Sequence, residues 1–298
     1  MPNRVLRVGL AQLACEPYEP VVNADITTKA VASAAEQGAQ LVILPELAAT
    51  SYVLDRERLA PLAEEAVAYG SCLHAWSEAA RQHGVAICGG FVEREGDRLF
   101  NSVAVFDPTG SLLGTYRKLH LFGRESAVFE PGDHGLPVFE VAGVRLGILV
   151  CYDLRFPEAM RILALEGAEV IGVPTAWVAG FDRTVPDHGF IGQVQAALVQ
   201  ANLNQVYVAC ADQVGTSQEF QLLGRSVLGD PFGDAVLGPL DATRPAVVVH
   251  ELRLDELEQA RHRGLGIDPL QDRRTDVYGP ILGYTRPQPH ESVIGGTP

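Results

Sequence analysis

The sequence predicts a layered α/β domain, and three observations support this prediction. Short apolar runs of strand length alternate with segments of helical spacing along most of the chain. Turn signals such as Asp107-Pro108-Thr109-Gly110 separate some neighbouring apolar runs and indicate antiparallel hairpins within the sheets. The chain has 298 residues, 47% of them hydrophobic, which is enough to bury a large core.

The first part of the chain alternates strands and helices from its start. An Ala-rich helix is predicted over residues 26–37, and Gly38 follows it as a residue able to take the left-handed conformation that ends helices. Residues 56–83 are predicted to be largely helical, with a break near Gly70. The strands predicted in this part are residues 5–13, 41–44, 85–91, 99–106 and 112–117.

The second part continues the alternation. Helices are predicted from Phe156 to Gly167, over residues 184–203 and over residues 254–263. After Gly264 there is no periodicity, so this tail is expected to be either disordered or ordered by packing on a partner subunit. The strands predicted here are residues 136–141, 144–150, 170–173, 206–212, 224–228, 235–237 and 245–251.

Charge and cysteine content exclude several functional classes. The formal net charge is −14, which argues against a nucleic-acid or anionic-membrane partner. The five cysteines are widely spaced with no CxxC, so neither a metal site nor a disulfide framework is predicted. With no signal peptide and no apolar span long enough for a bilayer, the protein is predicted to be cytoplasmic with no membrane partner.

One cysteine lies where a strand is predicted to turn into a helix. The apolar run 144–150 ends directly at Cys151, and Pro157 and Glu158 then suit a first helical turn. A thiol at a strand end that faces a helix N-terminus has backbone N–H donors close by. From its position alone, Cys151 is as good a candidate for a buried structural cysteine as for a nucleophile.

Three further charged residues are candidates for chemistry beside that thiol. A thiol that attacks a carbonyl needs a proton acceptor, an oxyanion stabiliser and a proton donor for the leaving group. Glu46 follows an apolar strand, where desolvation would raise its pKa and make it a usable base. Lys118 closes the strand 112–117, and Glu125 lies in the next loop. For any one of them, an ordinary solvated side chain is the competing interpretation.

Taken together, these segments resemble the nitrilase superfamily of carbon–nitrogen hydrolases, in its amidase-type branch. Weaker similarities at 129–133, 174–177, 224–226 and 230–233 extend the likeness over residues 4–280. The three main blocks, which occur in the family's order, are Leu41-Val42-Ile43-Leu44-Pro45-Glu46, Tyr116-Arg117-Lys118-Leu119-His120-Leu121-Phe122 and Cys151-Tyr152-Asp153-Leu154-Arg155-Phe156-Pro157-Glu158.

The resemblance implies a four-layer α–β–β–α sandwich, with one carbon–nitrogen hydrolase domain over residues 1–280 and a C-terminal tail over 281–298. It implies a Glu–Lys–Cys triad in which Glu46 is the general base, Lys118 stabilises the oxyanion and Cys151 is the nucleophile. Glu125 would position the substrate and assist proton transfer, and the backbone N–H of Tyr152 would be a second oxyanion donor. A homo-oligomer, a dimer or larger, is expected, with no metal and no organic cofactor.

The implied reaction is hydrolysis of a small aliphatic or ω-carboxy amide through a thioester. Alternatives left open are an N-carbamoyl amidohydrolase, a nitrilase and a catalytically silent binding module. The expected substrate-binding residues are Trp177, Phe181 and Tyr52, and core packing is the competing interpretation for Trp177 and Phe181. A papain-like protease, a thiol redox sensor and a dinucleotide-binding protein lack their sequence signatures here.

Overall fold

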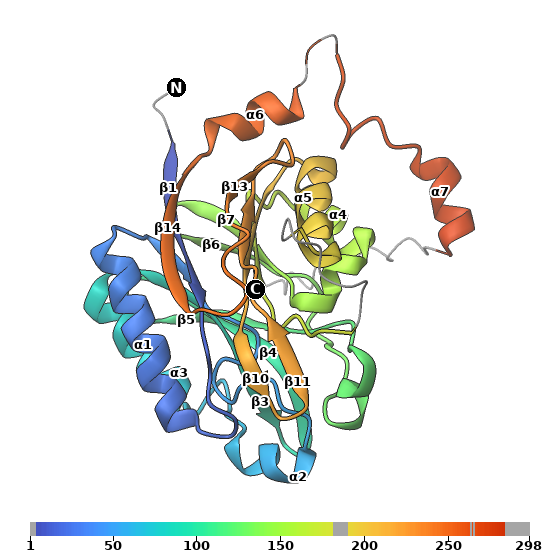
Figure 1. Ribbon diagram of the computed structural model, residues 1–298. Coiled ribbons are helices and arrows are strands. Elements are labelled where there is room, and N and C mark those ends of the chain that lie inside the picture. The colour runs from blue at the N-terminus through green and yellow to red at the C-terminus, as the bar shows by residue number, and fades with distance from the viewer. Residues whose placement is uncertain (1–3, 181–189, 263, 265, 284–298) are drawn as a thin grey trace, which may run out of the picture.

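Two six-stranded sheets pack face to face, and each carries a pair of helices on its outer surface (Figure 1). This computed structural model describes residues 4–180, 190–262, 264 and 266–283. The first sheet has the order β14-β1-β2-β3-β4-β5, with strands Ala246–Arg253, Val5–Gln12, Leu41–Ile43, Ala86–Glu95, Arg98–Phe106 and Leu112–Arg117. The second has the order β13-β12-β9-β8-β7-β6, with strands Ala235–Leu237, Val227–Gly229, Tyr207–Ala211, Val170–Pro174, Val144–Ile148 and Val138–Val141.

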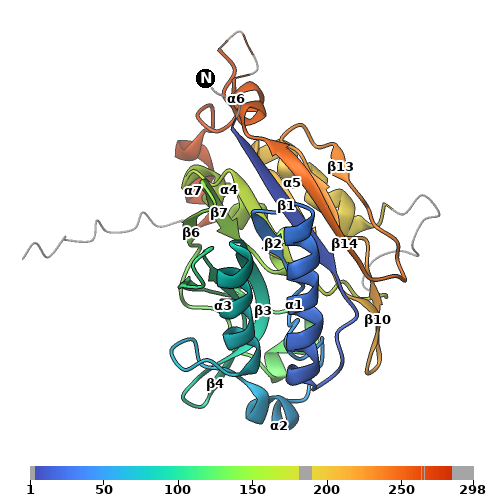
Figure 2. The same ribbon diagram turned by 90° about the vertical axis from the view of Figure 1, so that its left-hand side faces the viewer.

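The helices complete the predicted four layers. Helices α1 (Pro20–Glu36) and α3 (Ser71–His83) lie side by side on the first sheet, as Figure 2 shows. Helices α4 (Pro157–Leu165) and α5 (Gly192–Asn204) pack against the second sheet. The α–β–β–α arrangement predicted from the sequence is therefore confirmed. The shorter helical elements are α2 (Arg56–Leu59), α6 (Asp255–Arg261), α7 (Thr275–Leu282) and the 3-10 turns Ala60–Leu62, Gly123–Ala127 and Cys151–Arg155.

The largest core cluster lies between the two sheets. Leu10 and Ile43 from the first sheet and Ile148 and Val173 from the second are all fully buried in it. Strands β2, β8 and β9 are short, apolar and buried at every position, as buried parallel strands usually are, and β7 differs from them at the exposed Arg145. Their carboxyl ends meet at one edge of the interface between the sheets.

Three predicted helical segments differ in extent from those observed. Within residues 56–83 the predicted break near Gly70 is confirmed, since α3 begins at Ser71. The break is longer than predicted, because the helical structure before it stops at Leu62. The Glu64 carboxylate accepts hydrogen bonds from the N–H groups of Cys72 and Leu73 and so caps the start of α3. Helix α5 begins at Gly192 rather than at 184, since Phe190 and Ile191 precede it in non-helical conformation.

Helix α1 begins at Pro20, six residues earlier than predicted, because proline suits a first helical turn.

Two elements were missed altogether. The hairpin of β10 (Val214–Ser217) and β11 (Phe220–Leu223) turns at Gln218, which takes a positive φ of 52° without a glycine. Helix α7 lies in the tail predicted to have no periodicity.

Candidate functional site

Three of the predicted site residues follow strands that end at the same edge of the molecule. Glu46 follows β2, Lys118 directly follows β5, and Cys151 follows β7 after two further residues. Glu46 and Lys118 come from the first sheet and Cys151 comes from the second. The site is therefore assembled across the interface between the sheets.

Lys118 lies between two carboxylates. Its Nζ is 2.7 Å from Glu46 Oε1 and 2.8 Å from Glu125 Oε1, and none of the three side chains is exposed. A buried ammonium with two such partners is held in one position. Burial by itself would lower the pKa of Lys118, but the charges of Glu125 and Glu46 outweigh burial and raise it. Lys118 is consequently a permanent cation in this structure.

Glu125 is fixed from both of its oxygens. Tyr52 donates its hydroxyl to Oε1 at 2.8 Å, and the backbone N–H of Phe122 donates to Oε2 at 3.0 Å. Tyr52 is buried and packs edge-on against Phe220 at a centroid distance of 5.1 Å. Tyr52, predicted to bind substrate, thus contacts the Glu125 carboxylate, which in turn holds Lys118.

Glu46 is positioned by its backbone and by one amide side chain. Its carbonyl accepts a hydrogen bond from Gln213 Nε2 at 2.7 Å, and its Oε1 accepts one from Asn101 Nδ2 at 2.7 Å. The chain at Pro45 and Glu46 passes so close to β3 that a Cβ on Gly90 would lie 2.4 Å from the nitrogen of Leu47. Only glycine fits there without a shift of the backbone.

The second carboxylate oxygen of Glu46 has no hydrogen-bond partner among the described residues. Burial raises the pKa of Glu46, and the charge of Glu125 raises it further, while Lys118 and Asn101 oppose the rise. A carboxylate with a raised pKa and an unoccupied oxygen is suited to accept a proton.

Cys151 occupies a sharp turn at the start of the 3-10 segment Cys151–Arg155. Its φ is +45°, an uncommon conformation for a residue with a side chain and one that clusters at functional sites. Burial and the Glu46 charge raise the pKa of the Cys151 thiol well above its ordinary value, although Lys118 and a backbone hydrogen bond from Ala176 oppose this. The thiol is therefore neutral at rest and requires a base before it attacks.

Asp153 connects the cysteine turn with the lysine segment. Its Oδ2 accepts the Tyr116 hydroxyl at 2.7 Å and the Val150 N–H at 3.0 Å. Its Oδ1 accepts the His120 backbone N–H at 3.1 Å and lies 2.8 Å from His120 Nδ1. Tyr116 and His120 stand two residues before and after Lys118, so one buried carboxylate sets the cysteine turn relative to the lysine.

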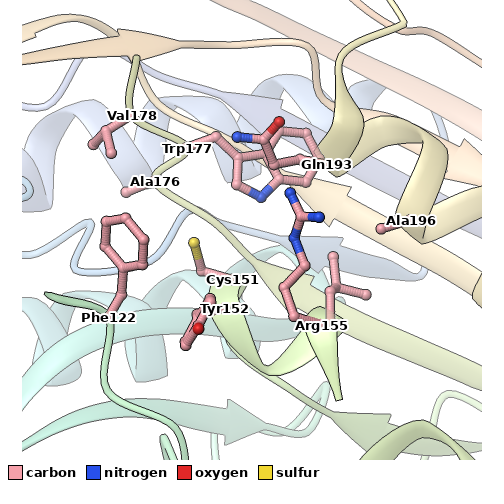
Figure 3. A pocket seen from close by; sticks show the side chains of 10 residues that line it. Phe122, Cys151, Tyr152, Arg155, Ala176, Trp177, Val178, Gln193 and Ala196 are labelled. Carbon is pink, nitrogen blue, oxygen red and sulfur yellow. The ribbon is translucent and has the colours of Figure 1, made fainter. Parts of the chain in front are cut away.

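A pocket opens beside the Cys151 sulfur (Figure 3). Its walls are mostly apolar and aromatic, with two longer polar side chains, those of Arg155 and Gln193. Trp177, predicted to bind substrate, is one wall, and its backbone N–H donates to Asp212 Oδ1 at 2.9 Å. The lining residues are Phe122, Cys151, Tyr152, Leu154, Arg155, Ala176, Trp177, Val178, Gln193 and Ala196.

Of the other predicted substrate-binding residues, Phe181 lies outside the described residues, and Tyr52 is not part of the pocket wall. Asn101, Asp153 and Gln193 were not predicted as site residues. Asn101 carried a usable signal, because an amide inside the apolar run of residues 99–106 needs a buried partner. Asp153 and Gln193 gave no comparable signal, since their partners come from distant segments.

Within the described residues (4–180, 190–262, 264 and 266–283), no group of three or more His, Cys, Asp or Glu side chains is arranged to hold a metal ion. In the same part of the chain, none of the helices has both the length and the apolar character required to cross a membrane.

Comparison with known proteins decides the family. The model of the carbon–nitrogen hydrolase family matches residues 7–262. The chain belongs to this family. A nitrilase of Pyrococcus abyssi is 36% identical over 276 residues, covering 92% of this chain and 99% of that protein. An (R)-stereoselective amidase of Pseudomonas sp. is 34% identical, covering 92% of this chain and 93% of the amidase.

Solved structures agree with the family match. An amidase of the nitrilase superfamily from Nesterenkonia sp. AN1 superposes with a TM-score of 0.75 at 29% identity, covering 93% of this chain and 97% of that one. A variant of the same amidase carries the acetamide moiety of fluoroacetamide on its active-site cysteine. As a carbon–nitrogen hydrolase, this protein hydrolyses non-peptide C–N bonds, and the predicted family and enzyme class are confirmed.

Proposed function

We propose that this carbon–nitrogen hydrolase is a cysteine-dependent amidase that cleaves a small aliphatic or ω-carboxy amide into a carboxylic acid and ammonia. The observation that carries the proposal is the placement of buried Lys118 between Glu46 and Glu125, on the edge where Cys151 opens into a pocket. This arrangement provides a base, a fixed cation and a nucleophile within one water-poor site.

In the first half of the reaction, Glu46 takes the thiol proton while the Cys151 sulfur forms a bond to the amide carbon. Lys118 and the backbone N–H of Tyr152 stabilise the negative charge that develops on the amide oxygen. One donor of this kind is worth about 3 kcal/mol of transition-state stabilisation. Protonated Glu46 then gives its proton to the leaving nitrogen, the C–N bond breaks, and ammonia departs from a thioester.

In the second half, water attacks the thioester carbon and gives a proton to Glu46. The C–S bond breaks, the carboxylic acid is released, and the proton on Glu46 returns to the sulfur. Glu125 holds Lys118 and positions the substrate throughout. Trp177 forms a wall of the acyl pocket. Tyr52 acts on the substrate only through Glu125, and Phe181 is proposed as a further substrate contact. No step in this scheme requires a metal ion or an organic cofactor.

The test is ammonia release from a panel of small amides, N-carbamoyl compounds and nitriles, measured for the wild type and Cys151→Ala. Cys15→Ala is the matched control, because Cys15 is a buried thiol outside the site. We expect Cys151→Ala to abolish turnover and Cys15→Ala to retain it. Mass spectrometry of the wild type quenched during turnover should show an acyl group on Cys151. Equal turnover by the wild type and Cys151→Ala would rule out the thioester mechanism.

An N-carbamoyl amidohydrolase is the second candidate, because an N-carbamoylputrescine amidase of Solanum tuberosum is 30% identical over 297 residues. The same panel separates these candidates. Carbon dioxide released together with ammonia would identify carbamoyl hydrolysis, and turnover of nitriles in preference to all amides would identify a nitrilase. A wild type that binds these compounds but turns over none of them would identify a silent binding module.

We further infer that the hydrolase domain spans residues 1–280 and that the chain forms a homo-oligomer, a dimer or larger. Ile162 and Leu165 on α4 and Val199 and Leu203 on the neighbouring α5 are large apolar side chains exposed by 43–55%, which supports a subunit contact on this face. Light scattering tests this subunit contact by comparing the wild type with the double variant Val199→Glu/Leu203→Glu. The variant should have a lower molar mass in solution.

We also propose that the enzyme is cytoplasmic. All five cysteines, which lie within the described residues, are free, and this suits a reducing compartment. Fractionation of cells that express a tagged full-length chain tests the assignment, and recovery outside the cytoplasmic fraction would contradict it.

A further inference from the structure

One polar side chain in the pocket wall has no role in the scheme above. Gln193, in the first turn of α5, is only 5% exposed and lines the same pocket as Cys151. Its Oε1 is buried and accepts no hydrogen bond from any described residue. In Figure 3 the carboxamide lies beside Trp177, across the pocket from the cysteine sulfur.

A buried carbonyl oxygen without a donor is costly. Leaving such a group unsatisfied loses its hydration without replacement, and the unmatched groups of native structures often belong to functional sites. The Arg155 guanidinium is on the same side of the pocket in Figure 3, yet Oε1 accepts no hydrogen bond from it. The neighbouring walls, Leu154, Val178 and Ala196, have no side-chain donors to offer.

The group best placed to satisfy Oε1 is therefore part of a bound substrate. When a primary amide is hydrolysed the leaving group is ammonia, so nearly all of the substrate inside the pocket belongs to the acyl chain. A hydroxyl or a carboxamide on that chain carries the O–H or N–H that Oε1 lacks, whereas a carboxylate has no hydrogen to donate.

We infer that Gln193 is a specificity-determining residue that selects amides whose acyl chain carries a neutral hydrogen-bond donor, a hydroxyl or a carboxamide. This inference rests on the amidase function proposed above and narrows its substrate class, because it disfavours the ω-carboxy amides named there. An enzyme site built to pair with a polar group discriminates strongly against analogues without that group, because its own buried atom then stays unpaired. Gln193 contacts the substrate in this assignment but takes no part in proton transfer.

The experiment compares straight-chain amides of four to six carbons with their ω-hydroxy and ω-carboxy derivatives. Values of kcat/KM are measured for the wild type, Gln193→Leu and Gln193→Glu. The control is Gln195→Leu, which alters an exposed glutamine two residues along the same helix. Circular dichroism and Tm show whether each variant is folded, and Gln193→Glu keeps an acceptor if the leucine variant is unstable.

We expect the wild type and Gln195→Leu to prefer the ω-hydroxy amide over its unsubstituted partner by about 10-fold, the value of one buried hydrogen bond. Gln193→Leu should remove this preference, so that its kcat/KM values for the ω-hydroxy amide and its unsubstituted partner become about equal. Gln193→Glu should retain the hydroxyl preference and reject the ω-carboxy amide.

Two results would overturn the inference while leaving the amidase function intact. One is an unchanged ω-hydroxy preference in Gln193→Leu, and the other is a wild type that favours unsubstituted or ω-carboxy amides. The proposed function itself would fail in a different way. Either the wild type would hydrolyse no amide, or the Cys151→Ala variant would still hydrolyse amides. Isothermal titration of Cys151→Ala with each matched pair of amides then gives the binding preference without turnover.

Discussion

The Tyr116 hydroxyl donates a 2.7 Å hydrogen bond to the Asp153 carboxylate, and this bond joins two of the three segments that carry the proposed triad. Tyr116 lies near the end of β5, two residues before Lys118, and Asp153 lies two residues after Cys151. The lysine and the cysteine belong to different sheets, so their separation depends on contacts of this kind rather than on a shared strand.

Tyr116→Phe should therefore reduce catalysis more than it reduces binding. The change removes one donor from a buried carboxylate and adds no bulk, so we expect a loss of about 1.5–3 kcal/mol in the free energy of unfolding. With Asp153 less firmly held, kcat should fall by roughly 10-fold and KM should change little. Steady-state kinetics on the amide that the wild type hydrolyses best would measure both.

Tyr207→Phe is the control for this variant. The Tyr207 hydroxyl donates to the Arg253 carbonyl and to Glu256, away from the site, so its loss should reduce stability while kcat stays unchanged. A Tyr116→Phe enzyme with the same kcat as Tyr207→Phe would contradict the positioning role of Asp153.

Gly90→Ala should displace the general base. The added methyl group would meet the backbone at Pro45, Glu46 and Leu47 at 2.4–2.7 Å, and no flexible side chain is available there to move aside. We expect kcat/KM to fall by 100-fold or more, since a shift of about 1 Å in a catalytic group costs that much. Gly279→Ala, with nothing within 4 Å of the added methyl, should keep full activity. A fully active Gly90→Ala would show that the Glu46 segment tolerates displacement.

The pH profile should report the environment of Glu46. Its pKa is raised, so activity should rise with pH through a range above that of an ordinary carboxyl group as Glu46 loses its proton. Asn101 donates to Glu46 and opposes this rise, so Asn101→Leu should shift the acidic limb of kcat/KM to higher pH. An acidic limb that stays fixed or moves to lower pH would contradict Glu46 as the base.

Lys118→Met should destabilise the protein and inactivate it. The change leaves two buried carboxylates without their cation, and breaking a buried ion pair in this way costs about 3–5 kcal/mol. Loss of the oxyanion cation should also lower kcat by about 10²–10³. Lys29→Met, which removes an exposed pair with Asp25, should change stability by less than about 1 kcal/mol. Denaturant unfolding and turnover number measure the two effects separately.

Much of the fold could be predicted because it depends on local pattern. The runs that became β1, β2 and β8 are apolar or alternate with strand periodicity, and their boundaries in the structure agree with the prediction to within two residues. The start of α3 was predicted from the break near Gly70, but its cap was not, because the cap is Glu64, a carboxylate seven residues before Ser71 that reaches forward to the helix. The turn at Gln218 has no glycine to mark it.

The residues of the site also divide into those that could be predicted from the sequence and those that could not. Glu46, Lys118 and Cys151 each end or follow a strand, and strand ends can be located from sequence. Their roles were predicted from a family resemblance, and the structure places Lys118 within hydrogen-bond distance of both glutamates. Asp153 and Gln193 are different, because what distinguishes them is the partners they have or lack in three dimensions. No spacing rule in one sequence encodes those contacts.

The pairing of β14 with β1 has a consequence for synthesis of the enzyme. Strand β14 (Ala246–Arg253) forms the edge of the sheet that holds Glu46 and Lys118, although the other five strands of that sheet are complete by Arg117. The second sheet, from which Cys151 follows, is made from the chain between Arg117 and β14. A ribosome that has released only the first half of the protein has therefore released a sheet with its β1 edge unpaired and no nucleophile. Hydrolytic activity should appear only after almost the whole chain has emerged, which makes it a measure of complete synthesis.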